Sequence, residues 1–214
     1  MDSVDPSQDA LFASIFPRVV SKAERRKIQI LEATIECFAT RGIDSTAYEH
    51  IAKKCGASRT LIIHYFPNRQ ELEMLAIQYI RADMQKAAVE AIQKAKTPEK
   101  RLEAYVQSTF DWTKEKPSFM TVWLLFFYYC GVRPEFKAMH TKLTTMGHER
   151  IIALMEGLPE NKRAQKKDIS LRAKTLQALI TGGLVAVQAE YLSMPRSAFV
   201  AQTIHDCLRI AKGE

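Results

Sequence analysis

Residues 46–72 of the chain read TAYEHIAKKCGASRTLIIHYFPNRQEL. Thr46 and Glu49, three residues apart, predict the capped start of a short helix. Gly56 stands where the chain needs a tight or left-handed turn, and Ser58 can cap a second helix of about two turns. Two short helices joined by a glycine turn are typical of a helix-turn-helix, whose second helix enters the major groove of DNA. The stretch therefore predicts a DNA-binding element.

The sequence on either side of this stretch predicts a three-helix head over residues 21–67. Ser21 and Glu24 form a capping box, and Gly42 can end the helix that they begin. Between them, apolar residues recur at steps of 3, 4 and 3, which indicates one buried helix face; they are Ile28, Leu31, Ile35 and Phe38. Asn68 and Glu71 then open the next helix.

The rest of the chain predicts a larger helical body over residues 68–214. We expect helices over about 68–94, 97–115, 117–131, 134–155, 168–192 and 195–212, from capping residues, prolines and apolar spacing. No segment shows the alternation of a strand. Residues 1–20 lack helical periodicity and are expected to form a partly ordered arm. The fold class is therefore all-α, with about nine helices, a helix-turn-helix head and a ligand-binding and dimerisation body.

Composition narrows the class of protein further. The 214 residues are 47% hydrophobic, which suffices for one large domain or for a head and a body. No run reaches the roughly 18 apolar residues of a membrane span, and no secretory signal is present. The four cysteines lack CxxC spacing, so we expect reduced thiols in a cytoplasmic protein rather than disulfides or a zinc site.

The net charge of +7 suits a polyanionic partner such as DNA. Between residues 21 and 81, however, ten basic and seven acidic residues leave a surplus of only +3. The charge is consistent with DNA binding but does not locate it.

The string GASRTLIIHYFPNRQEL, residues 56–72, resembles the signature of the tetracycline-repressor (TetR) family of bacterial transcription regulators. The order of expected helices agrees over the remaining chain. Two stretches of the body, WLLFFYYCGVRPEF at 123–136 and ALITGGLVAV at 178–187, are similar to the choline-responsive repressors of betaine synthesis within that family. The resemblance implies a homodimer that places one recognition helix of each subunit in successive major grooves of a palindromic operator. It also implies a small-molecule pocket in the body.

The resemblance assigns the DNA contacts residue by residue. Thr46 would contact phosphate, Arg59 and Thr60 would contact base edges or phosphates, and His64, Tyr65 and Arg69 would contact the backbone. Ser58 belongs with these because small polar side chains suit base edges and phosphates. Thr60 stands where glycine is common in the family, and Ile63 where an aromatic residue is frequent, which puts contacts at these two positions in doubt. An ordinary surface or packing role is the alternative for Arg59, His64 and Tyr65.

Aromatic residues concentrate in the middle of the body, and the expected helix over 118–130 is apolar on nearly every face. For any single ring, a place in the core is the better interpretation. Some rings are nevertheless expected to line a pocket, since ligand pockets are mostly apolar with few polar anchors. The candidate ligand-binding residues are Phe110, Trp112, Phe119, Trp123, Phe127 and Tyr128, with His140 as a polar anchor.

The expected ligand is a small hydrophobic or amphipathic molecule. A cationic ligand is the alternative, held by an aromatic cage of Trp112, Trp123, Tyr128 and Tyr129. His140 and His148 lie eight residues apart with no further ligand at metal spacing, so neither a metal nor another cofactor is expected.

The last two helices carry the dimer hypothesis, because each has a broad apolar stripe that a four-helix bundle across a two-fold axis would bury. The alternative is that these stripes close the core of the single chain. The candidate interface residues are Leu176, Ile180, Gly183, Leu184, Val187, Ile204 and Leu208.

The sequence therefore predicts a cytoplasmic, homodimeric repressor that a small molecule releases from its operator. An enzyme is not expected, because the chain has no nucleophile elbow, phosphate loop, metal pair or paired carboxylates in an apolar setting. A helical adaptor that binds protein, and a regulator that activates rather than represses, remain as alternatives.

Overall fold

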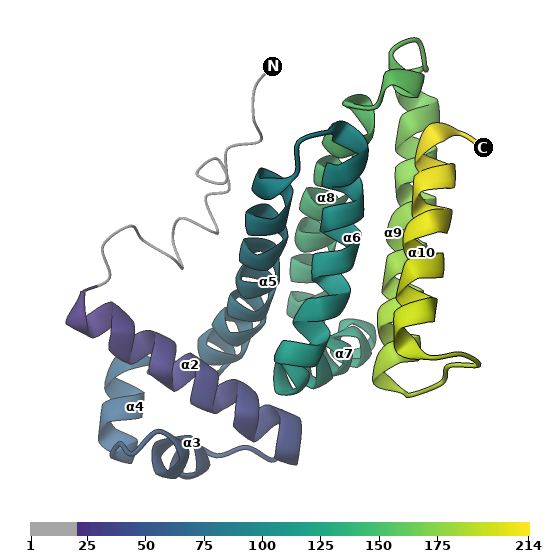
Figure 1. Ribbon diagram of the computed structural model, residues 1–214. Coiled ribbons are helices and arrows are strands. Elements are labelled where there is room, and N and C mark those ends of the chain that lie inside the picture. The colour runs from purple at the N-terminus through teal and green to yellow at the C-terminus, as the bar shows by residue number, and fades with distance from the viewer. Residues whose placement is uncertain (1–20) are drawn as a thin grey trace. The chain divides into compact units, whose positions relative to one another are not determined.

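The computed structural model describes residues 21–214, and every regular element in that part is helical (Figure 1). The expected arm, residues 1–20, lies outside the described residues. The elements are α2 (Lys22–Arg41), α3 (Tyr48–Lys54), α4 (Arg59–Tyr65), α5 (Arg69–Lys94), α6 (Pro98–Glu115), α7 (Pro117–Val132), α8 (Pro134–Glu156), the 3₁₀ turn η2 (Pro159–Asn161), α9 (Lys166–Gln188) and α10 (Arg196–Lys212). The all-α prediction is confirmed.

Most helix starts follow the predicted caps. The Ser21 hydroxyl accepts from the Glu24 amide at 3.1 Å, and the Glu24 carboxylate accepts from the Ser21 amide at 2.7 Å. Ser58 caps α4 by accepting from the Leu61 amide at 3.1 Å, and Asn68 caps α5. These contacts satisfy amides that have no partner inside the helix.

The predicted capping box of Thr46 and Glu49 is wrong. Helix α3 begins at Tyr48, with Ala47 as its N-cap. Thr46 lies one residue before this N-cap, and its hydroxyl instead donates to the Gly42 carbonyl at 2.8 Å.

Two glycines have the left-handed backbone that their positions require. Gly42 ends α2 with a φ of +83°, and Gly56 turns the chain between α3 and α4 with a φ of +61°. Helix α9 ends at Gln188 rather than near the expected Leu192, and Glu190 beyond it has a φ of +53°. Left-handed backbone of this kind cannot continue a helix.

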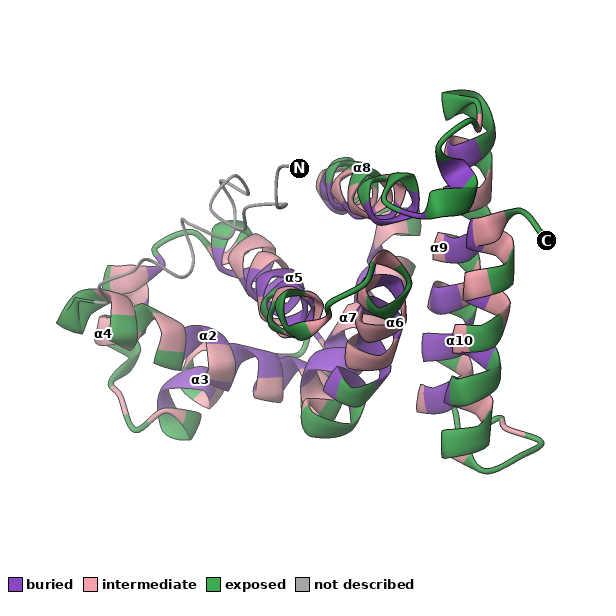
Figure 2. Cartoon of the chain, turned by 45° about the horizontal axis from the view of Figure 1, so that its top comes forward, coloured by how far each residue is buried: buried purple, intermediate pink, exposed green. Residues whose placement is uncertain are grey.

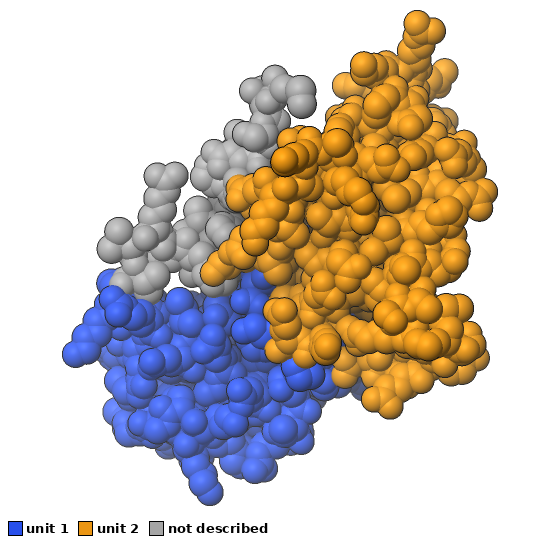
Figure 3. Space-filling model, viewed as in Figure 1, with its two compact units in different colours: residues 1–83, 116–136 blue, residues 84–115, 137–214 orange. Residues whose placement is uncertain are grey.

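Contacts divide the chain into two compact units, coloured separately in Figure 3. Unit 1 holds the described residues up to Asp83 together with Lys116–Phe136, and unit 2 holds Met84–Glu115 with Lys137–Glu214. Helix α5 therefore contributes to both units, and α7 belongs with the helix-turn-helix. The expected boundary between residues 67 and 68 concerns the functional division of the chain and stays a prediction.

Unit 1 is built on α2, which packs against both α3 and α7, while α3 packs against α4. Its inward side chains are fully buried, among them Ile35, Phe38, Ile51 and Ile62. The buried stretches of α2 and α3 are purple in Figure 2. Burial of each such side chain stabilises the folded state by about 1.5–3 kcal/mol. Unit 1 therefore holds the helix-turn-helix against a rigid apolar core.

Unit 2 contains the mutually packed helices α6, α9 and α10. Gly183 lets α9 approach α6 closely, because a Cβ at this position would lie 2.8 Å from Cζ of Phe110. The Arg196 side chain donates to the Phe110 carbonyl at 2.8 Å, which fixes the start of α10 on α6. Within residues 21–214, no helix is both long enough and apolar enough to cross a bilayer.

Candidate DNA-binding site

Helix α4 presents a polar face to solvent. Arg59, Thr60 and His64 are exposed, and Thr60 and His64, four residues apart, are neighbours on the helix surface. Ile62 on the opposite side is fully buried. Ser58 is also exposed, next to the first turn. A short helix with this division can enter a groove of DNA while its other face stays anchored in the protein.

The position of α4 is fixed by contacts with the helix before it. The Tyr48 hydroxyl of α3 donates to the Phe66 carbonyl at the end of α4, over 2.9 Å. At the turn, the Ala57 amide donates to the Ala52 carbonyl, also over 2.9 Å. The two helices therefore form one rigid helix-turn-helix, as the sequence predicted.

Arg59 is available to DNA although it already has a partner. Its Nε lies 2.8 Å from Oε1 of Glu49, and both side chains are about 60% exposed. An exposed ion pair of this kind stabilises a protein by only about 0.2–1 kcal/mol, so a phosphate or a base edge can replace Glu49.

Two predicted DNA contacts point into the protein instead. Thr46 is only 4% exposed, and its hydroxyl donates to Gly42. The Arg69 guanidinium donates to Glu73 at 2.7 Å and to the Ile43 carbonyl at 2.8 Å. Both polar groups are bonded within the head, and contact of Thr46 and Arg69 with DNA stays a prediction.

The remaining predicted contact, Tyr65, is half-buried and packs edge-on against His64, with 5.4 Å between the ring centroids.

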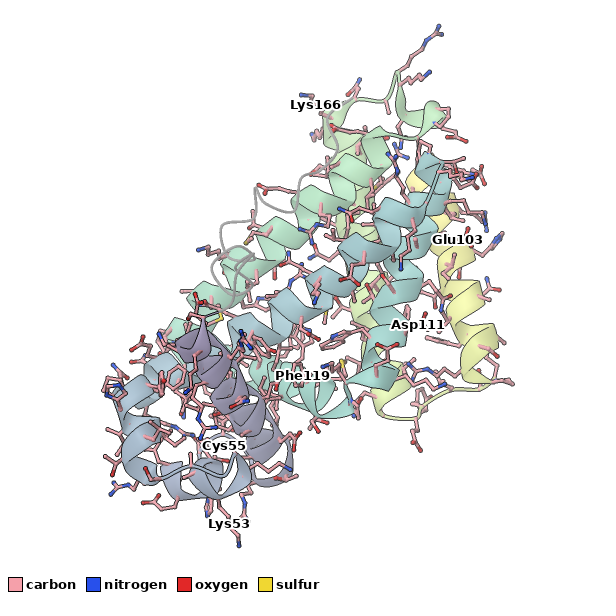
Figure 4. The ribbon with its side chains drawn as sticks, turned by 60° about the vertical axis from the view of Figure 1, so that its left-hand side comes forward. Lys53, Cys55, Glu103, Asp111, Phe119 and Lys166 are labelled. Atoms are coloured by element: carbon pink, nitrogen blue, oxygen red, sulfur yellow. The ribbon has the colours of Figure 1, made fainter. Side chains whose placement is uncertain are left out.

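Lys53, which was not among the predicted contacts, is exposed in the last turn of α3 and projects from the head (Figure 4). Its neighbour Lys54 pairs with Glu36. The basic pair KK just before the glycine turn was the available signal for these residues.

The candidate ligand-binding residues fall into both units. Phe110 and Trp112, on α6, are buried in unit 2, and Phe110 meets Phe199 edge-on at 6.3 Å. His140, on α8, is half-buried in unit 2, and burial lowers its pKa. The other four lie on α7 in unit 1, where exposure ranges from buried Phe119 to largely exposed Tyr128; they are Phe119, Trp123, Phe127 and Tyr128. Their role in ligand binding stays a prediction.

The candidate dimer residues separate into two groups. Ile204 and Leu208 on α10 are half-exposed. The five on α9 are buried inside unit 2, where they pack the core of their own chain; they are Leu176, Ile180, Gly183, Leu184 and Val187. The apolar stripe that the sequence displays is thus the inward face of α9, and the use of these five residues at a dimer interface stays a prediction.

Two family models match the chain. Residues 30–73 match the bacterial regulatory proteins of the tetR family, and residues 98–206, just over half of the chain, match the C-terminal domain of BetI-type transcriptional repressors. The protein belongs to the TetR family of bacterial regulators. The first match contains the helix-turn-helix, including the exposed face of α4.

Individual relatives agree with the family. The chain is 26% identical over 165 residues to the HTH-type transcriptional regulator BetI of Burkholderia cenocepacia, covering 76% of this chain and 82% of the relative. It is 28% identical over 111 residues to BetI of Agrobacterium fabrum, covering 52% and 53%. The alignment therefore extends well beyond the head.

Solved structures share the fold. A transcriptional regulator from Pseudomonas aeruginosa superposes with a TM-score of 0.75 at 21% identity, covering 96% of this chain and 95% of the other. A regulator from Saccharomonospora viridis, solved in complex with choline, gives 0.73 at 18% identity, covering 85% and 94%. The TetR-family protein described here is a transcription regulator and not an enzyme.

Proposed function

We propose that the protein is a repressor that binds a palindromic operator as a homodimer and is released by a small hydrophobic or amphipathic molecule. The observation that carries the proposal is the exposed polar face of α4 above a buried apolar face. A helix of two turns contacts few base pairs, so two copies related by a two-fold axis are needed to recognise an operator.

Five of the predicted residues stay as DNA contacts, namely Ser58, Arg59, Thr60, His64 and Tyr65. The first test is selection of random duplex DNA on the purified protein, followed by sequencing. A palindromic motif with half-sites about 34–36 Å apart, or a multiple of that, is expected. Failure to enrich any motif at low salt would reject operator recognition and favour a protein-binding adaptor.

Variants separate base recognition from phosphate binding. Tyr65→Phe is expected to weaken binding to all sequences alike, because a phosphate contact carries no sequence information. Arg59→Ala is expected to change the preferred sequence. Arg163→Ala, which removes an exposed arginine from the loop before α9, is the control for loss of one positive charge. If both head variants behave like this control, the contact assignment is wrong.

For the dimer, we propose the outward face of α9. Five of its exposed residues recur at steps of 4, 3, 4 and 3 and are small or apolar, although the exposed Lys174 lies beside them; they are Leu171, Thr175, Ala178, Gly182 and Val185. Such a seam allows close packing of two helices. The half-exposed Ile204 and Leu208 of α10 stay in the proposed interface.

Val185→Arg tests this interface by placing a charge on the outward face of α9. Sedimentation should show monomers, since burial of an unpaired charge is costly. Val132→Arg, at another exposed valine on α7, is the matched control and should leave the mass unchanged. A Val185→Arg protein that stays dimeric would move the interface elsewhere.

The proposed effector is amphipathic, and the choline complex of the Saccharomonospora viridis regulator supports a cationic headgroup as one form of it. The chain has two tryptophans, Trp112 and Trp123, and both are candidate pocket residues. Titration with choline should change their fluorescence and release the selected duplex. Glycerol at the same concentrations is the control. A choline titration without either effect would exclude this cation and leave an uncharged ligand.

A reporter gene behind the selected duplex decides between repression and activation. Repression predicts a rise in expression when the gene for this protein is deleted, and a fall would identify an activator. We place the protein in the cytoplasm, where its DNA partner lies.

A further inference from the structure

The junction between α7 and α8 holds a charged side chain that contacts two other segments of unit 1. Arg133 ends α7 as its C-cap residue. Its Nη1 donates to Oε2 of Glu73 on α5 at 2.8 Å, and its Nη2 donates to Asp44 in the loop between α2 and α3. One guanidinium therefore connects the end of α7 to both α5 and the loop that leads into the helix-turn-helix.

A second residue of α7 strengthens the connection to Asp44. The Tyr129 hydroxyl donates to Oδ2 of Asp44 at 2.7 Å, so that both carboxylate oxygens are bound by α7. The guanidinium carbon of Arg133 lies 4.7 Å from the centroid of the Tyr129 ring, within range of a cation–π attraction. Burial, followed by the hydrogen bond to Asp44, raises the pKa of Tyr129 to about 12, so the hydroxyl stays a donor at neutral pH.

Glu73 connects Arg133 to Arg69, which binds the same loop at Ile43. Its side chain is 7% exposed, and its second oxygen accepts from Nε of Arg69 at 2.7 Å. Arg69 also donates to the Ile43 carbonyl at 2.8 Å. The loop is therefore bound at Ile43 from α5 and at Asp44 from α7. We call Asp44, Glu73, Tyr129 and Arg133 the Arg133 cluster.

The loop controls where the helix-turn-helix begins. Asp44 lies three residues before Ala47, the N-cap of α3, and the Thr46 amide donates to the Ile43 carbonyl at 3.3 Å. Since Tyr48 at the start of α3 bonds to Phe66 at the end of α4, a shift of the loop moves both helices together. A change in the orientation of α4 of this kind alters every base contact at once.

We propose that Arg133 is a positioning residue for DNA recognition, acting through Asp44 and Glu73 without touching DNA. Arg133 is suited to this because its planar fork bridges two carboxylates, which a lysine ammonium cannot reproduce. The chain leaves unit 1 three residues later, after Phe136. Arg133 thus ties the helix-turn-helix to the point where the chain enters unit 2.

The test compares the affinity of variants for the duplex selected by the wild-type protein and for a scrambled duplex of equal length. Arg133→Lys keeps the charge but removes the fork, and should lower specific affinity by about tenfold while non-specific affinity stays unchanged. Lys100→Gln, which breaks an exposed pair with Glu103 in unit 2, is the control and should leave the ratio of the two affinities unchanged.

Asp44→Asn gives the sharper result because general electrostatics and positioning predict opposite signs. Removal of a negative charge from the head strengthens attraction to DNA. Loss of the Arg133 contact is expected to weaken specific binding by about tenfold despite that gain. The specific affinity of the Asp44→Asn, Arg133→Lys double variant should be no lower than that of whichever single variant binds the duplex less tightly. An unchanged affinity ratio in both single variants would overturn the proposal.

Amide hydrogen exchange tests the cluster without DNA. Faster exchange over residues 43–54 is expected in both variants, with melting temperatures close to wild type. Unchanged exchange in that segment would refute the positioning role. The inference rests on DNA binding by the head. A wild-type protein that selects no duplex refutes the proposed function. Hydrogen exchange over residues 43–54 then decides whether Arg133 positions the helix-turn-helix. If Arg133→Lys does not fold, Asp44→Asn, at an exposed residue, gives the same decision.

Discussion

Glu73→Gln is the substitution whose effect on stability follows most directly from the structure. The glutamate is 7% exposed and gives one carboxylate oxygen to Arg69 and the other to Arg133. Glutamine has the same shape but no charge, and its amide NH₂ would face one of two arginines that can only donate. Two guanidiniums would lose their shared counter-charge at once.

The size of the loss can be bounded from the exposure of the partners. Removal of one partner from a buried ion pair costs about 3–5 kcal/mol. The side chains of Arg69 and Arg133 are 29% and 27% exposed, so water recovers part of this loss. We therefore expect the free energy of unfolding to fall by about 2–3 kcal/mol.

Glu103→Gln is the matched control, with the same change in shape and charge. Glu103 pairs with Lys100 at 2.6 Å, but the lysine side chain is 65% exposed, so a loss of about 0.5 kcal/mol or less is expected. Urea unfolding followed by far-UV circular dichroism, at one protein concentration, measures both. Equal unfolding midpoints for the two variants would show that the Glu73 pairs contribute no more than surface pairs, and would refute this account.

The remaining predictions concern the core, the cap and the charge of the DNA-binding face. Gly183→Ala should destabilise the protein by about 1–3 kcal/mol relative to Gly131→Ala in thermal melting, because a Cβ at Gly183 meets Phe110 while one at Gly131 meets nothing, and both variants gain the same helix propensity; equal melting points would contradict this. Ser58→Ala should lower the free energy of unfolding by about 1 kcal/mol, whereas Ser58→Asn keeps the cap and should leave it unchanged; an equal loss in both variants would show that the cap does not stabilise α4. Arg59→Ala should reduce the slope of log affinity against log salt by about 1 if this arginine contacts phosphate.

Local signals in the sequence predicted the local structure well. Ser21, Ser58 and Asn68 cap helices because a cap needs only a polar side chain two or three residues before the amide that it binds. Thr46 failed because a loop residue can bond backward to Gly42 as easily as forward. Spacing alone does not distinguish these two choices.

The sequence could not reveal which face of α9 lies inside. Broad apolar stripes indicate burial, but the burial can be against the same chain or a partner. In the structure the large side chains such as Leu176 and Leu184 fill the core, and the outward seam consists of less conspicuous residues such as Ala178 and Gly182. Spacing likewise gives no indication that Arg133 meets Asp44, because 89 residues separate them.

The grouping of α7 with the head bears on how such a regulator can switch. The chain passes between the two units within α5, after α6 and at the start of α8. A ligand can change DNA affinity only to the extent that it binds two shapes of the protein differently. In unit 1, the contacts that would distinguish such shapes are those of α7 with the loop before α3, since these join the DNA-binding helices to a segment whose two ends continue into unit 2. Under the positioning role that we propose for Arg133, a ligand that moves the ends of α7 acts on the loop before α3 through the Arg133 cluster, and through the loop on α4.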